Sequence, residues 1–232
     1  MNLAYTSTST STFRHTVPAV GELLSTVFVV DEQSHVRESL GERVCSDEWQ
    51  HETLGSIDQL LAYPRPFLPN CLLVALAALG SNPVELQRKI AREREEMAIV
   101  IISDRDDIPT TVRAMKAGAF DFLVKPISND GLRSAIRQSL VHSRAILERE
   151  SAARDLCDRY SSMSVREKQV MALVVSGLLN KQVGGELGIS EITVKAHRGR
   201  VMQKMGASSF ADLVRMAAKL ERAIPSIGVG GN

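Results

Sequence analysis

The chain has 232 residues, of which 44% are hydrophobic, 24% charged and 4% aromatic, and its formal net charge is +1. This length suits two domains of ordinary size, and the composition excludes a disordered or fibrous chain. No apolar run approaches the ~20 residues of a spanning helix, and the N-terminus lacks a basic flank followed by an apolar stretch. The three cysteines are far apart without a Cys-x-x-Cys pair. We therefore expect a soluble, cytoplasmic protein with no membrane partner, disulfide framework or metal site.

The two ends of the chain are expected to be tails. Residues 1–24 include seven consecutive Ser/Thr residues, Thr6 to Thr12, which cannot bury a core. Residues 225–232 form a second short tail after the last predicted helix.

Residues 25–143 alternate short apolar runs with amphipathic segments, a pattern typical of an α/β domain. The runs predict strands at Val27–Val30, Gln50–Leu54 (the weakest), Cys71–Leu76, Ala98–Ile102 and Phe120–Val124. The segments between them predict helices at Ser34–Val44, Ile57–Ala62, Val84–Glu95 and Thr110–Ala117. Apolar strands separated by helices indicate a doubly wound parallel sheet covered on both faces, with function at the carboxyl ends of its strands.

One long helix is predicted from Asp130 to Tyr160, because this stretch contains no proline and Gly131 is its only glycine. Its first half carries Leu132, Ile136 and Leu140, which favour packing on the sheet. A dimer-forming coiled coil is the alternative, although the heptads are not sustained. Residues 144–160 are expected to form a linker helix.

Residues 161–224 predict an all-α domain of four helices. Ser164 and Glu167 have the spacing of a capping box that begins the first helix, which ends near Ser176. The others are expected at Asn180–Leu187, from Ser190 to Gly206 and at about Ser208–Leu220. A three-residue turn between the second and third indicates a helix-turn-helix module. This domain holds ten Lys/Arg and five Asp/Glu, so its formal charge is +5, whereas the rest of the chain has a formal charge of −4. Such a basic module is expected to bind a polyanion.

The third helix of this domain carries the candidate DNA contacts. Val194, Val201 and Met205 are expected to face the core, and Glu191, Lys195, Arg198 and Met202 to form an open face. Lys195 and Arg198 are the predicted base contacts because they lie nearer the helix N-terminus. Thr193, Ala196 and Arg200 flank the open face, and Arg200 and Lys204 are the predicted phosphate contacts. The capping Ser190 completes the predicted DNA-binding set.

Three further residues of the domain are expected to have structural roles. His197 lies between Val194 and Val201 and is interpreted as structural. The pair Gly184–Gly185 favours close packing of two helices, with a more mobile module as the alternative.

These C-terminal motifs carry a family resemblance. Met163-Ser-Val-Arg-Glu-Lys-Gln-Val170, Asn180-Lys-Gln-Val, Leu187-Gly-Ile-Ser-Glu-Ile-Thr-Val-Lys195 and His197-Arg-Gly-Arg-Val-Met202 resemble the LuxR-type helix-turn-helix of NarL/FixJ response regulators. The resemblance implies a transcription regulator that binds double-stranded DNA as a dimer, with Lys195 and its neighbours in the major groove.

The N-terminal domain resembles the receiver domain of the same two-component systems. Val27-Phe-Val-Val-Asp-Glu32, Ile101-Ile-Ser103, Val112-Arg-Ala-Met-Lys-Ala-Gly-Ala-Phe-Asp-Phe122 and Leu123-Val-Lys-Pro126 carry this resemblance. It implies that Asp31 and Glu32 match the Mg²⁺-holding acids. Ser103 and Lys125 match the groups that sense the phosphoryl group, and Phe122 the aromatic switch.

The third strand departs from that pattern, because Ala75 stands where receivers carry the phosphate-accepting aspartate. A methyl group can neither attack a phosphoryl donor nor bind Mg²⁺, so we expect an atypical receiver without aspartyl phosphate and with weak Mg²⁺ binding. Asp31, Glu32 and Lys125 are expected to form an internal ion pair. Use of the remaining polar pocket by Ser103 or by an unrelated ligand is the alternative.

The apolar run from Leu72 to Leu79 is expected to be a buried strand that continues into a loop packed over the vacated site. An exposed patch that binds a partner is the alternative.

Two functional hypotheses follow. The first is a DNA-binding regulator whose receiver-like domain dimerises through Thr110–Ala117 and Phe120–Ser139. The second is an interaction protein that sequesters another response regulator or a sensor kinase. An enzyme is not expected, since no nucleophile–base pair is visible and histidines 15, 35, 51, 142 and 197 show no ligand spacing. No cofactor is expected either.

Overall fold

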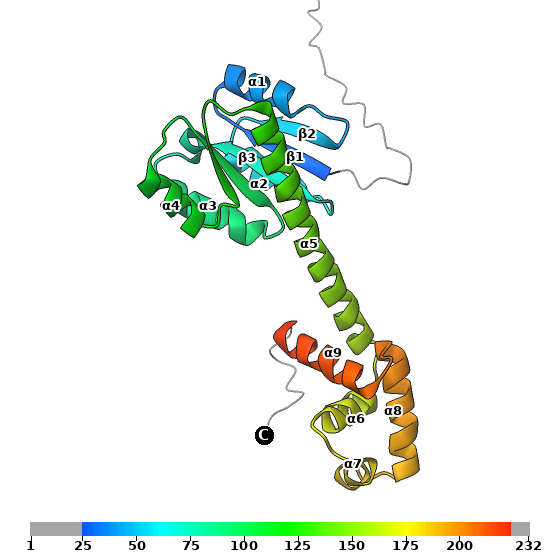
Figure 1. Ribbon diagram of the computed structural model, residues 1–232. Coiled ribbons are helices and arrows are strands. Elements are labelled where there is room, and N and C mark those ends of the chain that lie inside the picture. The colour runs from blue at the N-terminus through cyan, green and yellow to red at the C-terminus, as the bar shows by residue number, and fades with distance from the viewer. Residues whose placement is uncertain (1–24, 224–232) are drawn as a thin grey trace, which may run out of the picture.

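The computed structural model describes residues 25–223, so the predicted tails, and His15 with them, lie outside the described part. Residues 25–124 contribute a five-stranded parallel sheet in the order β2-β1-β3-β4-β5 (Figure 1). The strands are β1 (Ser25–Val30), β2 (Trp49–Leu54), β3 (Asn70–Ala75), β4 (Ala98–Ser103) and β5 (Asp121–Val124). The order reverses between β1 and β3, which is where ligands bind in open α/β sheets.

Helices cover both faces of this sheet. They are α1 (Ser34–Val44), α2 (Ile57–Ala62), α3 (Pro83–Glu93), α4 (Ile108–Lys116) and the first half of α5 (Asn129–Ser161). Apolar side chains of α1 and α5 pack on one face, against Val27 and Val29, and those of α2, α3 and α4 pack on the other, against Phe28 and Val30. Neighbouring β1 residues point to opposite faces, so a strand buried on both sides must be apolar throughout. The doubly wound α/β fold predicted from the sequence is therefore confirmed.

Local capping explains why α4 begins earlier than predicted. The Asp107 side chain accepts from the Thr110 N–H, so α4 begins at Ile108 rather than Thr110. The strand β3 ends at Ala75, because a 3₁₀ helix, η1 (Leu76–Leu79), follows directly.

The long helix α5 runs without a break from the sheet to the C-terminal domain (Figure 1). Leu132, Ile136 and Leu140 are buried on the sheet, which confirms the predicted packing of its first half. Leu156, near the other end, is buried in the core of the C-terminal domain. One continuous helix thus contributes to both hydrophobic cores.

Ion pairs brace the middle of α5 against loops of the sheet domain. Arg65 binds the buried Glu96 through two hydrogen bonds of 2.9 and 2.6 Å and also pairs with Glu150 of α5 at 3.3 Å. Arg154, one turn further, pairs with the same Glu150 at 3.3 Å and lies over the ring of Phe67. Two charge-assisted hydrogen bonds to the buried Glu96 carboxylate fix Arg65, and Arg65 in turn holds α5 through Glu150.

The C-terminal domain consists of α6 (Val165–Val175), α7 (Asn180–Leu187), α8 (Glu191–Met205) and α9 (Phe210–Ala223). The capping box of Ser164 and Glu167 is present as predicted. Ser190 caps α8, and Gly188 adopts the left-handed conformation (φ 66°) that ends α7. The predicted four-helix, helix-turn-helix domain is confirmed.

The two neighbouring glycines of α7 differ in their surroundings. A Cβ added at Gly184 would lie 2.7 Å from the Ile189 carbonyl oxygen, so α7 and the turn approach each other closely there. A Cβ added at Gly185 would meet open space among the described residues. The close-packing interpretation is therefore confirmed for Gly184 alone.

Among residues 25–223, no helix combines the length and the apolar character that crossing a bilayer requires.

Candidate nucleic-acid interface and receiver cleft

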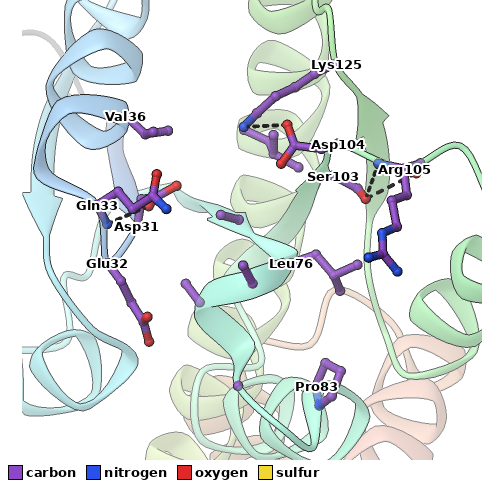
Figure 2. A pocket seen from close by; sticks show the side chains of 15 residues that line it. Asp31, Glu32, Gln33, Val36, Leu76, Pro83, Ser103, Asp104, Arg105 and Lys125 are labelled. Carbon is purple, nitrogen blue, oxygen red and sulfur yellow. Dashed lines mark hydrogen bonds and ion pairs between the residues drawn. The ribbon is translucent and has the colours of Figure 1, made fainter.

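A cleft of about 420 Å³ opens at the carboxyl ends of the strands, where the strand order reverses between β1 and β3 (Figure 2). Asp31 follows β1, Ala75 ends β3, Ser103 ends β4 and Lys125 follows β5. The parallel sheet brings these residues together because its carboxyl ends share one edge.

Lys125 does not pair with the acids that follow β1, contrary to the prediction. Its ammonium lies 3.0 Å from Asp104 Oδ1, in the loop after β4 (Figure 2). The buried Asp31 carboxylate accepts instead from the Gln33 N–H at 2.8 Å, and the exposed Glu32 points away from it. Asp104 follows β4, the strand beside β5, and so offers Lys125 a nearer carboxylate.

Ser103 and Phe122, two other predicted cleft residues, interact with the sheet domain through hydrogen bonds and core packing. Ser103 Oγ accepts from the Arg105 N–H at 3.0 Å and donates to the Arg105 carbonyl oxygen at 3.1 Å. Phe122 is half-buried and packs against the apolar core that contains Phe28 and Ile101.

The wall of the cleft formed by β3 is apolar. Ala75 is 8% exposed, and Ala78 and Leu79 of η1 are buried in the core below it. Leu72 to Ala75, Ala78 and Leu79 are buried as predicted, and this burial contradicts the partner-patch alternative. Leu76 is half-buried and Ala77 is exposed, and both line the cleft. The segment therefore forms one wall of an open cleft, and the prediction that it packs over the vacated site is wrong.

The side chains present do not fit a Mg²⁺ site. Mg²⁺ prefers several oxygen ligands in octahedral geometry. Asp31 and Glu32 diverge, Ala75 offers a methyl group, and residues 25–223 contain no group of three or more His, Cys, Asp or Glu side chains able to hold a metal ion.

The helix α8 presents the candidate nucleic-acid interface. Five predicted contacts, Thr193, Lys195, Ala196, Arg200 and Lys204, are exposed along it. Ser190 Oγ accepts from the Thr193 N–H at 3.1 Å, which fixes the first turn. Val194, Val201 and Met205 are fully buried, as predicted for the opposite side of the helix.

Arg198 and Met202 are half-buried, so they lie at the edge of the predicted open face, and the base contact of Arg198 stays a prediction. Arg198 is half-buried, donates to Asn180 Oδ1 at 2.6 Å and stacks over the Phe210 ring with 5.4 Å to its centroid. Met202 packs against the domain core. Arg198 therefore ties α8 to the start of α7 and to α9. His197, beside it, is half-buried, and its structural role stays a prediction.

Lys204 is likewise engaged within the domain. Its ammonium lies 2.8 Å from Glu167 and donates to the Ser162 carbonyl oxygen at 3.0 Å. The hydrogen bond from Lys204, followed by that from the Ser164 N–H, lowers the pKa of Glu167 from 4.5 to about 2. Lys204 thus anchors the end of α8 to the cap of α6.

The exposed face of α8 includes residues that the sequence analysis did not single out. Ile192 is 82% exposed, and Gly199 and Gln203 are exposed further along. Ile192, Lys195, Ala196 and Gly199 stand at positions i, i+3, i+4 and i+7, which share one side of a helix. This i, i+3, i+4, i+7 spacing is visible in the sequence and could have identified the exposed face. Because apolar residues occur on two sides of α8, the sequence did not show which side is buried.

Comparisons with known proteins agree with both domains. Residues 161–217 match the family of bacterial regulatory proteins named luxR, and residues 27–137 match the response regulator receiver domain. Nodulation protein W of Bradyrhizobium diazoefficiens is 39% identical over 84% of this chain and 86% of its own length. The transcriptional regulatory protein FixJ of Azorhizobium caulinodans is 35% identical over 82% of this chain and 90% of its own.

A solved structure agrees with the whole arrangement. The response regulator StyR has 40% sequence identity and a TM-score of 0.73, covering 84% of this chain and 99% of its own. The chain therefore belongs to the NarL/FixJ-type response regulators, transcription factors in which a receiver domain precedes a LuxR-type DNA-binding domain.

Proposed function

We propose that this response-regulator transcription factor binds double-stranded DNA as a homodimer without aspartyl phosphorylation. In this proposal the receiver domain serves for dimerisation or partner binding rather than as a phosphorylation switch. DNA as the ligand implies action in the cytoplasm.

The observation that carries the proposal is Ala75 at the carboxyl end of β3, in the wall of the cleft. Phosphoryl transfer needs a nucleophilic oxygen, and a methyl group has none. Lys125 already has a carboxylate partner in Asp104, and the Ser103 hydroxyl is bonded to Arg105. The cleft thus offers no free nucleophile–cation pair, so no enzymatic activity is proposed.

The test is incubation of the full-length protein with acetyl phosphate and Mg²⁺, followed by intact-mass measurement. No phosphoryl adduct is expected on the wild type. The variant Ala75→Asp is the control, since an adduct on it alone would tie the lost reaction to this side chain. An adduct on the wild type contradicts the proposal.

For DNA binding we assign the main base contact to Lys195, with Thr193, Ala196, Arg200 and the capping Ser190 beside it. These residues are exposed on a helix that follows a three-residue turn, in a domain of formal charge +5. Arg198 and Lys204 are assigned to holding α8 in place, because their charges already bind partners inside the domain.

For dimerisation we propose the face of α4, which extends the predicted surface Thr110–Ala117 and Phe120–Ser139 to include Ile108. Ile108, Val112 and Met115 are 76%, 44% and 44% exposed there and stand at i, i+4 and i+7. Pairing two such faces buries apolar surface, and two-fold symmetry then presents two α8 helices to two half-sites.

Sequestration of another response regulator or a sensor kinase is the second candidate, because the same apolar α4 face suits a different partner. Selection of the full-length protein on a random duplex pool at two salt concentrations separates the two. Enrichment of a paired motif with a steep salt dependence supports the DNA regulator. Selection of no duplex supports sequestration.

A further inference from the structure

We propose that Ile192 determines DNA sequence specificity by contacting the methyl group of a thymine in each half-site. This inference rests on the proposed DNA binding and names the base that is recognised and the residue that recognises it. It assigns a role to a side chain that contributes nothing to the domain's core.

The position of Ile192 is that of a base-reading residue. It is the second residue of α8, 82% exposed, in a turn that the Ser190 cap holds in place. In helix-turn-helix proteins the N-terminal residues of the second helix contact base edges in the major groove. A branched apolar side chain at that place meets the bases and not the solvent once DNA is bound.

The neighbours of Ile192 give the surface its chemistry. Lys195, Ala196 and Gly199 lie on the same side of α8 and are exposed. The face is therefore mostly apolar, with a cation at its centre and Arg200 at its margin. Such charges suit a polyanion, which argues for DNA over an apolar protein partner.

Gly199 adds an independent observation. A Cβ built there meets no atom of the described residues within 4 Å, so packing does not require a glycine. Glycine weakens a helix interior, and a glycine without a packing role suits close approach of another molecule to the backbone. The bare backbone at Gly199 lets α8 lie deep in a groove, which brings Ile192 to the base edges.

The major groove offers one apolar group to such a side chain. Guanine, cytosine and adenine present hydrogen-bond donors and acceptors there, whereas thymine adds a C5-methyl group. Ile192 has no polar atom, so its contact distinguishes thymine by that methyl. Lys195, one turn further, can bond an adjacent guanine edge.

The experiment uses the full-length protein and its best selected duplex. Each thymine in turn is replaced by deoxyuridine, which keeps the base pair and removes only the methyl group. At one position in each half-site, wild-type affinity is expected to fall about fourfold, the effect of one buried methyl group. The variant Ile192→Ser is expected to bind both duplexes equally.

Val141→Ser is the matched control, because Val141 is a branched apolar residue, 68% exposed, on α5 outside the C-terminal domain. It is expected to keep the wild-type response to deoxyuridine. Far-UV circular dichroism is expected to be unchanged in Ile192→Ser, since that side chain lies outside the core.

The outcomes separate this inference from the proposed function. A wild type that binds thymine and deoxyuridine duplexes equally overturns the role of Ile192 and leaves DNA binding intact. A methyl effect that persists in Ile192→Ser assigns the contact to another residue and also overturns it. Selection of no duplex at all overturns both proposals.

Discussion

Replacing Glu167 by glutamine is expected to destabilise the C-terminal domain by about 1–2 kcal/mol at pH 7. The carboxylate is 4% exposed and accepts at 2.8 Å from both the Ser164 N–H and the Lys204 ammonium. Glutamine can keep the bond to the Ser164 N–H, so the substitution isolates the charge and its pairing with Lys204.

The magnitude follows from the pKa of Glu167, which these two bonds lower from 4.5 to about 2. A shift of that size corresponds to about 3 kcal/mol, which we reduce to about 2 because solvent reaches the partially exposed Lys204. The folded-state pKa lies below the unfolded one, so the stabilisation is present above pH 4.5 and is lost as the pH falls towards 2. About 1 kcal/mol of it disappears between pH 7 and pH 3.5.

Urea unfolding of the full-length protein, followed by far-UV circular dichroism at both pH values, measures this loss. Trp49, the single tryptophan, lies in β2, and its fluorescence reports separately on the receiver domain. Glu186→Gln is the control, because Glu186 is exposed and makes no ion pair within residues 25–223. If Glu167→Gln differs from the wild type by the same free energy at pH 7 and pH 3.5, the argument from the ionised carboxylate is refuted.

Four further substitutions test the interface, the dimer and the helix packing. Lys195→Ala is expected to weaken binding to the selected duplex at least fivefold, roughly the lower bound for losing one good base contact. Its circular dichroism spectrum is expected to be unchanged. Unchanged affinity would contradict the assignment of Lys195. Val112→Asp is expected to shift the protein from dimer to monomer in light scattering after gel filtration, and a persistent dimer would place the interface elsewhere. Gly184→Ala is expected to destabilise the C-terminal domain by about 1–3 kcal/mol, because its Cβ meets the Ile189 carbonyl oxygen. Its neighbour Gly185→Ala is expected to stabilise by up to about 1 kcal/mol; equal effects in urea unfolding would exclude the close approach at Gly184.

The elements of the fold could be predicted because their signals are local. Four apolar runs and one weaker run became the five strands, and the side chains of Ser164 and Ser190 cap helices where their spacing indicated. A strand buried on both faces must be apolar whatever surrounds it, and a cap bonds to an N–H only two or three residues away. Neither signal depends on distant parts of the chain.

The partners of charged side chains could not be predicted, because they depend on how remote segments approach. Lys204 meets Glu167, 37 residues earlier, and Lys125 meets Asp104 instead of the acids after β1. Sequence supplies many possible partners of opposite charge, and only the folded distances choose among them.

The rotation of α8 was the most consequential feature that tertiary structure decided. By itself the sequence determined that this helix is basic, capped and buried through Val194 and Val201. The sequence did not determine which side of α8 packs against the domain core, since apolar residues occur on two sides of the helix. Contacts with Asn180 and Phe210 draw Arg198 inward, and the opposite flank, with Ile192 at its start, is thereby left to solvent.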